Sequence, residues 1–205
     1  MTAIRNTTWS TAALLGAAGV GIAGGGVTAY LQGVLSADWN TVANSGAVWT
    51  LVAAVAAGVL GRQRGTAAAA GMLVLVGEVV GYYAYVTDVL HLPVLRAEEI
   101  LWTLAALWIG PLAGLAAFHA RWGRPSQRIV ALLAFCGVLG GEGAYLWRLA
   151  DVPAAGAVEV AAAGVGAFCA LLALPASVRD RMLAAGAAAL VGSGVFLAYS
   201  QPLIA

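Results

Sequence analysis

Seven long apolar runs, separated by short polar breaks, constrain this chain more than any other feature of its sequence. Each run has about 20 residues, enough for a helix to cross the ~30 Å hydrocarbon core of a bilayer. The composition agrees, since 62% of the 205 residues are hydrophobic and only 9% are charged, whereas soluble domains carry about 25% charged residues. The sequence therefore predicts an all-α membrane protein that forms a single seven-helix transmembrane domain over residues 1–205.

The polar breaks set the boundaries of the expected helices. They contain arginine, acidic residues, glycine or proline, as in "GRQRG", "HLPVLRAEE" and "PASVRDR", and such clusters favour turns and loops between spans. The expected helices cover residues 10–34, 43–61, 66–88, 98–119, 128–148, 155–175 and 182–201.

Arginine decides the expected orientation. All 10 basic residues are arginine, and only Arg96 and Arg148 lie outside the N-terminus and the loops after the second, fourth and sixth spans. Because positive charge is retained on the cytoplasmic side of a membrane, the N-terminus is predicted to be cytoplasmic. The lysine-free, alanine-rich composition looks like that of a high-GC bacterium, which indicates a multi-pass protein of the bacterial cell membrane.

The second to seventh spans resemble three helical hairpins of one orientation. "WTLVAA" from residue 49 resembles "WTLAAL" from residue 102. Two of the returning helices align without gaps, and the aligned residues are Gly77 with Gly137, Gly81 with Gly141, and Tyr85 with Tyr145. The repeated glycines predict close helix approach. We expect three hairpins around a common central pocket. The first span is an additional helix that does not belong to the repeat.

Three acidic residues, Glu78, Glu142 and Glu159, fall within spans. A carboxyl group in hydrocarbon is costly, so such residues normally face the interior of the bundle or a wet cavity, where they serve a function. We therefore expect Glu78 and Glu142 to be functional. Glu159 lies close enough to the outer interface that a solvated acid at a helix start remains an alternative.

Aromatic residues accompany these acids. Residues three and four apart share one face of a helix, so Glu78, Tyr82 and Tyr85 lie together. The repeat places Glu142 and Tyr145 on the equivalent face of the fifth span. The residues expected to line the pocket are Tyr82, Tyr85, Tyr145, Trp49, Trp102, Phe196 and Tyr199. Asn44, near the start of the second span, either binds a polar head group or caps the helix.

A carboxyl group in a dry aromatic pocket can deliver a proton. Removal from water and a second carboxyl nearby both favour the protonated form, so Glu78 or Glu142 is expected to act as a general acid. Aromatic faces would stabilise the resulting carbocation by about 2 kcal/mol each, and a dry pocket would protect it from water. Protonation of a terpene alkene or epoxide requires this combination.

The sequence lacks the motifs of other terpene chemistry. It contains no DDxxD-type or NSE-type magnesium cluster and no DxDD motif, and its cysteines and histidines show no metal-ligand spacing. No metal site and no cofactor are therefore expected. The substrate is predicted to have lost any diphosphate before it reaches this protein.

The motifs "GEVVGYYAY" (residues 77–85) and "GGEGAYLW" (residues 140–147) carry a resemblance. In a seven-span chain of this length they resemble the membrane-bound terpene cyclases of fungal meroterpenoid and bacterial drimentine-type indole sesquiterpene pathways. The resemblance implies protonation and cyclisation of a prenylated substrate such as a farnesylated, Trp-containing cyclodipeptide. It implies Glu142 and Glu78 as the acid–base pair, with Asp38 or Glu159 as secondary proton carriers.

Other functions remain open at this stage. The expected partners are a prenylated small molecule and the lipid bilayer, with no nucleic acid. A proton-coupled transporter would also bury carboxyl groups, although transporters often break their helices in mid-membrane, and Pro111 is the only mid-span proline here. A lipid-binding membrane protein would use the glutamates only for hydrogen bonds between helices.

Overall fold

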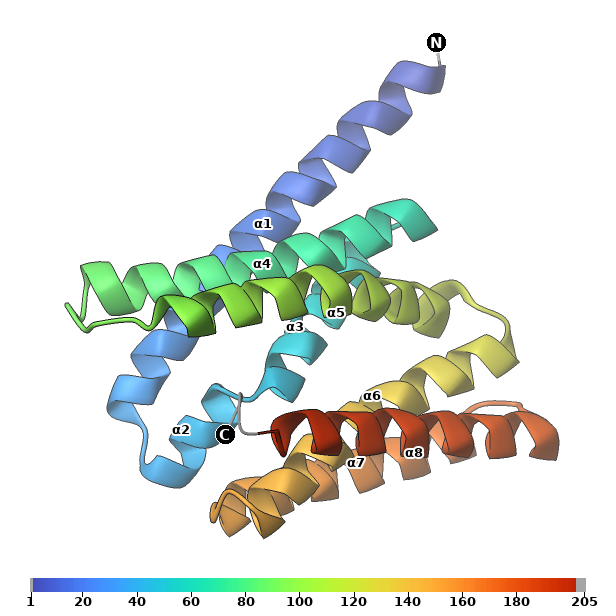
Figure 1. The fold of residues 1–205 in the computed structure, drawn as a ribbon. Helices are drawn as coiled ribbons and strands as arrows, with labels where there is room; N and C mark the ends of the chain where they lie inside the picture. The colour runs from blue at the N-terminus through green and yellow to red at the C-terminus, as the bar shows by residue number, and fades with distance from the viewer. Residues whose placement is uncertain (1, 202–205) are drawn as a thin grey trace. The chain divides into compact units, whose positions relative to one another are not determined.

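The computed structural model describes residues 2–201, apart from the side chains of residues 2–10, 37 and 38. The described chain is helical and forms no strand, which confirms the predicted all-α class. Its helices (Figure 1) are α1 (Thr2–Val34), α2 (Ala37–Ala43), α3 (Gly46–Leu60), α4 (Arg64–Asp88), α5 (Arg96–Trp122), α6 (Pro125–Arg148), α7 (Pro153–Ala173) and α8 (Val178–Tyr199).

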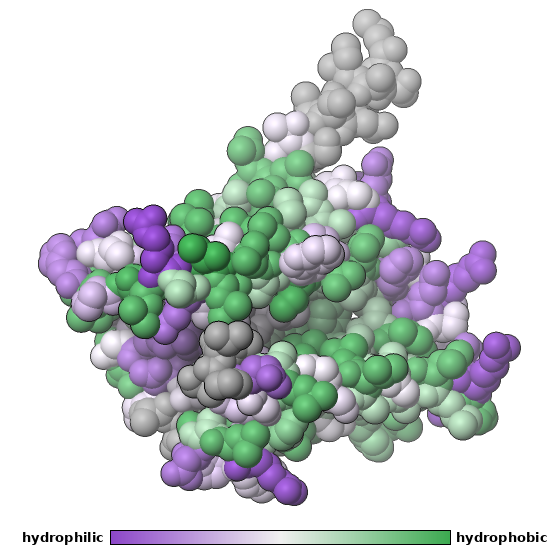
Figure 2. Space-filling model, viewed as in Figure 1, coloured by the Kyte–Doolittle hydropathy of each residue, from purple (hydrophilic) through white to green (hydrophobic). Residues whose placement is uncertain are grey.

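Seven segments of the described chain are long enough and apolar enough to cross a membrane, and α2 and α3 together form the second of them. Large apolar side chains stay exposed on the helices, as at Trp108 (77% exposed) and Leu190 (78% exposed). Figure 2 shows hydrophobic residues over much of the visible surface. Apolar exposure on this scale suits lipid rather than water. The chain is a multi-pass membrane protein, as predicted.

The second span departs from the prediction. The sequence predicts a loop before residue 43 and a continuous helix after it, whereas the structure forms α2 and then breaks at Asn44 and Ser45. The Ser45 hydroxyl accepts a hydrogen bond from the Val48 N–H at 3.2 Å, which caps α3 in the way that serine favours. Asn44 instead ends α2. The interpretation of Asn44 as a helix N-cap is therefore wrong.

Contacts divide the chain into two compact units. Unit 1 contains Met1–Val34 and Trp49–Phe118, and unit 2 contains Leu35–Val48 and His119–Ala205. The division separates α5 from α6, which the sequence predicts to form one hairpin. The arrangement of three hairpins around one pocket, and a single seven-helix domain, remain predictions.

Glycine allows α1 and α4 to approach closely within unit 1. Gly77 faces the backbone of Gly21, and a methyl group at Gly25 or Gly81 would collide with the backbone of the other helix. Small residues spaced four apart produce such contacts between membrane helices. The predicted close approach at Gly77 and Gly81 is confirmed.

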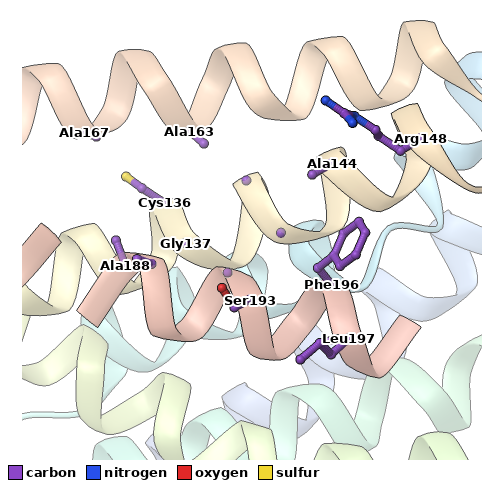
Figure 3. A pocket seen from close by; sticks show the side chains of 14 residues that line it. Cys136, Gly137, Ala144, Arg148, Ala163, Ala167, Ala188, Ser193, Phe196 and Leu197 are labelled. Carbon is purple, nitrogen blue, oxygen red and sulfur yellow. The ribbon is translucent and has the colours of Figure 1, made fainter. Parts of the chain in front are cut away.

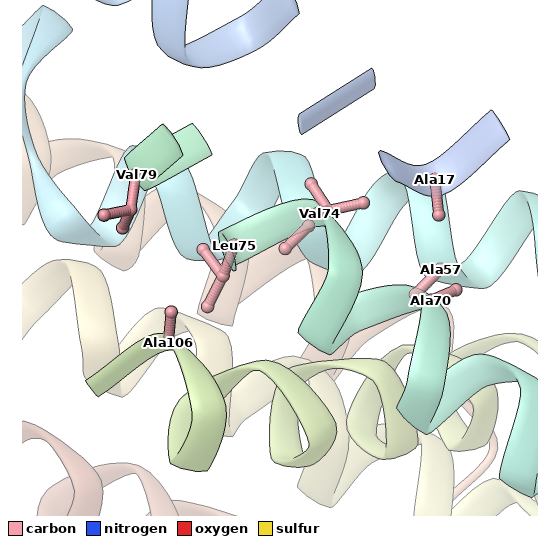
Figure 4. Packing of buried hydrophobic residues seen from close by; sticks show 8 residues of the cluster. Ala17, Ala57, Ala70, Val74, Leu75, Val79 and Ala106 are labelled. Carbon is pink, nitrogen blue, oxygen red and sulfur yellow. The ribbon is translucent and has the colours of Figure 1, made fainter. Parts of the chain in front are cut away.

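The apolar core of unit 1 lies around α4. Figure 4 shows residues from several helices of this unit meeting there. They include Val74, Leu75 and Val79 of α4, Ala17 of α1, Ala57 of α3 and Ala106 of α5. The buried neighbours from the other helices are alanines, so these helices pack closely against α4. Glu78 lies within this buried stretch of α4.

Helix α6 is the common contact of unit 2, with α7 and α8 packed against it, while α2 contacts α7. A methyl group at Gly137 would meet the Ala188 backbone of α8, and one at Gly141 would meet the Gly192 backbone. The predicted close approach at these two glycines is also confirmed. It holds the C-terminal half of α6, with Glu142, near its neighbours.

We expect Gly141→Ala to destabilise the protein, because the added methyl group would collide with the Gly192 carbonyl of α8. Overpacking of this kind costs about 1–3 kcal/mol. The measurement is the free energy of unfolding of the purified protein in an SDS titration. Gly194→Ala on α8 is the matched control, since its methyl group would meet no other atom within 4 Å. Equal stability of the two variants would contradict the prediction.

Candidate functional site

Three glutamates within the membrane-spanning helices are buried, and they lie in two places. The exposed fraction is 2% for Glu78, 3% for Glu142 and 2% for Glu159. Glu78 lies on α4 in unit 1, whereas Glu142 on α6 and Glu159 on α7 are neighbours in unit 2. The pairing of Glu142 with Glu78 remains a prediction, and the carboxyl group that the structure places beside Glu142 is that of Glu159.

Glu142 binds the start of α3 at the break in the second span. The Gly46 N–H donates to its Oε1 at 3.0 Å, and the Ala47 N–H donates to its Oε2 at 2.5 Å. These are the first two residues of α3, whose N–H groups find no acceptor within the helix. The start of a helix also carries partial positive charge. Both effects stabilise a carboxylate at this position.

Two hydroxyl groups complete the surroundings of Glu142. The Tyr199 hydroxyl of α8 donates a hydrogen bond to the Glu142 carboxyl, and the Ser45 hydroxyl lies beside the carboxyl groups of both Glu142 and Glu159. Gly46 leaves the space that the Tyr199 hydroxyl occupies, since a Cβ atom there would collide with it. The rings of Tyr145 and Tyr199 are 5.4 Å apart at an angle of 37°. An aromatic pair therefore borders this site.

Glu159 lies beside Glu142 and Ser45 but accepts no backbone hydrogen bond from the described residues. Neither carboxyl oxygen has a hydrogen-bond partner in the described part of the chain. Helix α7 begins at Pro153, and the Glu159 side chain lies against Gly143 of α6. The interpretation of Glu159 as a solvated acid at a helix start is therefore wrong. The lack of a backbone donor in the described chain separates Glu159 from Glu142, whose carboxyl group accepts two backbone hydrogen bonds.

Glu78 lies against α1 in unit 1. Gly24 faces its side chain, and Gly25 faces its backbone. Its Oε2 atom is buried without a hydrogen-bond partner among the described residues. Helix α1, which the repeat pattern treats as an addition, thus forms one wall of this second carboxyl site.

Aromatic residues gather near this part of unit 1. The ring centroids of Trp49 and Tyr82 are 5.7 Å apart, and Trp49 and Trp102 both pack against the core around α4. The Tyr82 hydroxyl donates to Gln32 Oε1 of α1 at 2.6 Å. The indole N–H of Trp49 is buried with no acceptor in the described chain.

The remaining predicted site residues lie elsewhere. Phe196 of α8 lines a groove against α6 and α7, Tyr85 is half-buried on α4, and Asn44 is exposed. Asp38 belongs to α2, and its side chain lies outside the described residues. The structure thus divides the residues predicted to line one pocket between unit 1 and unit 2.

Sequence reasoning does not identify Ser45, Gly46, Ala47 or Gln32 as site residues. Gly46 and Ala47 act through backbone N–H groups, which almost any residue type could provide, so the sequence does not reveal this role. A signal does exist, because serine followed by glycine before an apolar run is typical of a helix start. Gln32 is indicated only by its polarity within an apolar span. No group of His, Cys, Asp and Glu side chains in the described chain could hold a metal ion.

A comparison with protein families matches residues 4–205 to one family model. The chain belongs to DUF6518, a family of unknown function. The DUF6518 match includes both carboxyl sites. No curated protein and no solved structure matches the chain. Any statement about activity therefore depends on the chemistry of the sites.

We expect Glu142→Gln to destabilise the protein and Glu159→Gln to leave its stability nearly unchanged. An amide has one acceptor oxygen, so one N–H at the start of α3 would lose its partner, which costs about 1–3 kcal/mol when it is buried. At Glu159 the amide replaces a carboxyl group that makes no hydrogen bond with a described residue. The free energy of unfolding in SDS measures both effects. A larger loss for Glu159→Gln would contradict this description of the pair.

Proposed function

We propose that this protein is a membrane-bound, metal-independent terpene cyclase that protonates an alkene of a prenylated substrate. The observation that carries the proposal is the pair formed by Glu159, a buried carboxyl group without a donor, and Glu142, a carboxyl group held by two backbone N–H groups. Environments that separate the proton affinities of two neighbouring carboxyl groups provide an acid and a base together. The Tyr199 hydroxyl contacts Glu142 and its ring packs against that of Tyr145, and we assign this ring pair the role of stabilising the cation.

The proposed reaction consumes nothing except the substrate. Glu159 transfers its proton to the terminal alkene carbon, which leaves a tertiary cation. Neighbouring double bonds attack in turn and form the ring carbon–carbon bonds, while aromatic faces stabilise the cation by about 2 kcal/mol each. Glu142 then removes a proton from the carbon next to the final cation, which forms the product alkene. Glu142 then releases this proton to solvent and Glu159 takes up another from solvent, which restores the pair, and the product is an isomer of the substrate.

Glu78 is the second candidate acid. Its buried carboxyl group and the Trp49–Tyr82 ring pair lie in unit 1. They provide the same combination of acid and aromatic faces as the Glu142 site. Asp38 remains a candidate secondary proton carrier. The proposed substrate is a farnesylated, Trp-containing cyclodipeptide, and the proposed location is the plasma membrane of a bacterium.

We expect the purified protein to convert a farnesylated indole cyclodipeptide, in the presence of EDTA, into an isomer of identical mass. In D₂O the product should gain one deuterium, because the first step adds a proton that exchanges with solvent. Mass spectrometry measures both outcomes. Glu142→Gln and Glu159→Gln should each abolish the product, and Glu78→Gln tests the acid of unit 1.

Glu98→Gln is the matched control for these variants, since Glu98 is exposed in the first turn of α5. It should retain the wild-type rate. Unconverted substrate with a folded wild-type protein would count against a cyclase. An isomer that contains no deuterium would count against protonation as the first step.

A proton-coupled transporter is the second candidate, and the break in the second span favours it. Transporters often place the start of a half-helix against an anionic group within the membrane, as α3 is placed against Glu142. In proteoliposomes with a pH gradient, a transporter would accumulate the farnesylated cyclodipeptide unchanged. A cyclase would isomerise it with or without a gradient.

A further inference from the structure

A groove between α6, α7 and α8 lies within unit 2. It has a volume of about 810 Å³, and its lining is mostly glycine and alanine. Figure 3 shows the lining side chains, with Cys136 toward one end of the groove and Arg148 toward the other. The small side chains leave space along α6 that an apolar chain can fill.

The groove lies on the side of α6 away from Glu142. Its lining residues Cys136, Gly140 and Ala144 recur every four residues along one face of α6. With 3.6 residues in each turn, Glu142 lies roughly 160° around the helix from Gly140 and Ala144. Glu142 therefore lies on the face of α6 opposite the groove, and neither Glu142 nor Glu159 is among the lining residues.

Arg148 provides a positive charge at the end of the groove. It is the last residue of α6, where the span reaches the membrane interface. Its side chain extends back toward Ala144 and Ala163 rather than away from the groove (Figure 3). No ion pair or hydrogen bond of this side chain occurs within the described chain.

The length of the groove suits one lipid chain. Cys136 and Arg148 are 12 positions apart on α6, which corresponds to roughly 18 Å of helix. One leaflet contributes about half of the ~30 Å hydrocarbon core. An acyl chain that begins at the interface beside Arg148 would therefore reach about as far as Cys136.

We propose that this groove binds an anionic phospholipid, with its acyl chain along the glycine and alanine lining and its phosphate at Arg148. Charge complementarity selects this occupant, because a guanidinium group pairs with phosphate through two parallel hydrogen bonds. The lining contributes a single hydroxyl group, that of Ser193, besides Arg148. The rest of the groove suits a hydrocarbon chain and not a polar solute.

The experiment uses the full chain in nanodiscs that contain a phosphatidylglycerol with a diazirine in its acyl chain. After illumination, peptide mass spectrometry should locate the cross-links on groove residues of α6, α7 and α8, and not on the exposed Leu190 of α8. Arg148→Gln should reduce the labelling about tenfold, which corresponds to a loss of ~1.4 kcal/mol.

Two leucine variants provide a matched pair. Gly140→Leu would fill the groove, and its Cβ atom would meet only the Ala163 methyl group, at 3.7 Å. Gly164→Leu on α7 makes the same change outside the groove, with nothing within 4 Å of the added Cβ atom. The first should abolish labelling and the second should preserve it. Equal labelling by a phosphatidylcholine analogue, or labelling spread evenly over exposed apolar side chains, would overturn the proposal.

Discussion

The break in the second span is the constraint on which the carboxyl site of unit 2 depends. A helix that starts within an apolar layer exposes N–H groups that lipid cannot satisfy. Ser45 satisfies one of these groups, and Glu142 satisfies those of Gly46 and Ala47. The buried carboxyl group of Glu142 and the free N–H groups at the start of α3 therefore stabilise each other, because each would be unfavourable alone.

Close packing then decides what surrounds Glu142. Gly46 admits the Tyr199 hydroxyl, and Gly143 admits Glu159. Both positions would be blocked by a larger side chain, so the small residues that bring the helices together also bring the polar groups together. The result is an asymmetric pair, in which Glu142 accepts two backbone hydrogen bonds and Glu159 accepts none in the described chain. This asymmetry supports acid–base chemistry more directly than the mere presence of buried acids.

Prediction from sequence succeeds for the spans and for the burial of Glu78 and Glu142. The helix boundaries follow from apolar length and polar breaks, and the glycines at 77, 81, 137 and 141 indicate the close crossings that the structure contains. Prediction fails where partners come from backbone atoms or distant segments. The assignments of Asn44 as an N-cap and of Glu159 as a solvated acid are wrong, because each rested on a helix start placed by local pattern alone.

The sequence by itself determines that this chain crosses a membrane, because apolar length is a property of each segment alone. It also determines that Glu78 and Glu142 require a protected environment, because charge in hydrocarbon is costly. Only the tertiary structure decides which groups meet them. The placement of Glu142 at the start of α3, with Glu159 beside it, depends on the break at Asn44 and Ser45 and on how α6, α7 and α8 pack in unit 2. Contacts between residues so far apart in the chain leave no periodic pattern in the sequence.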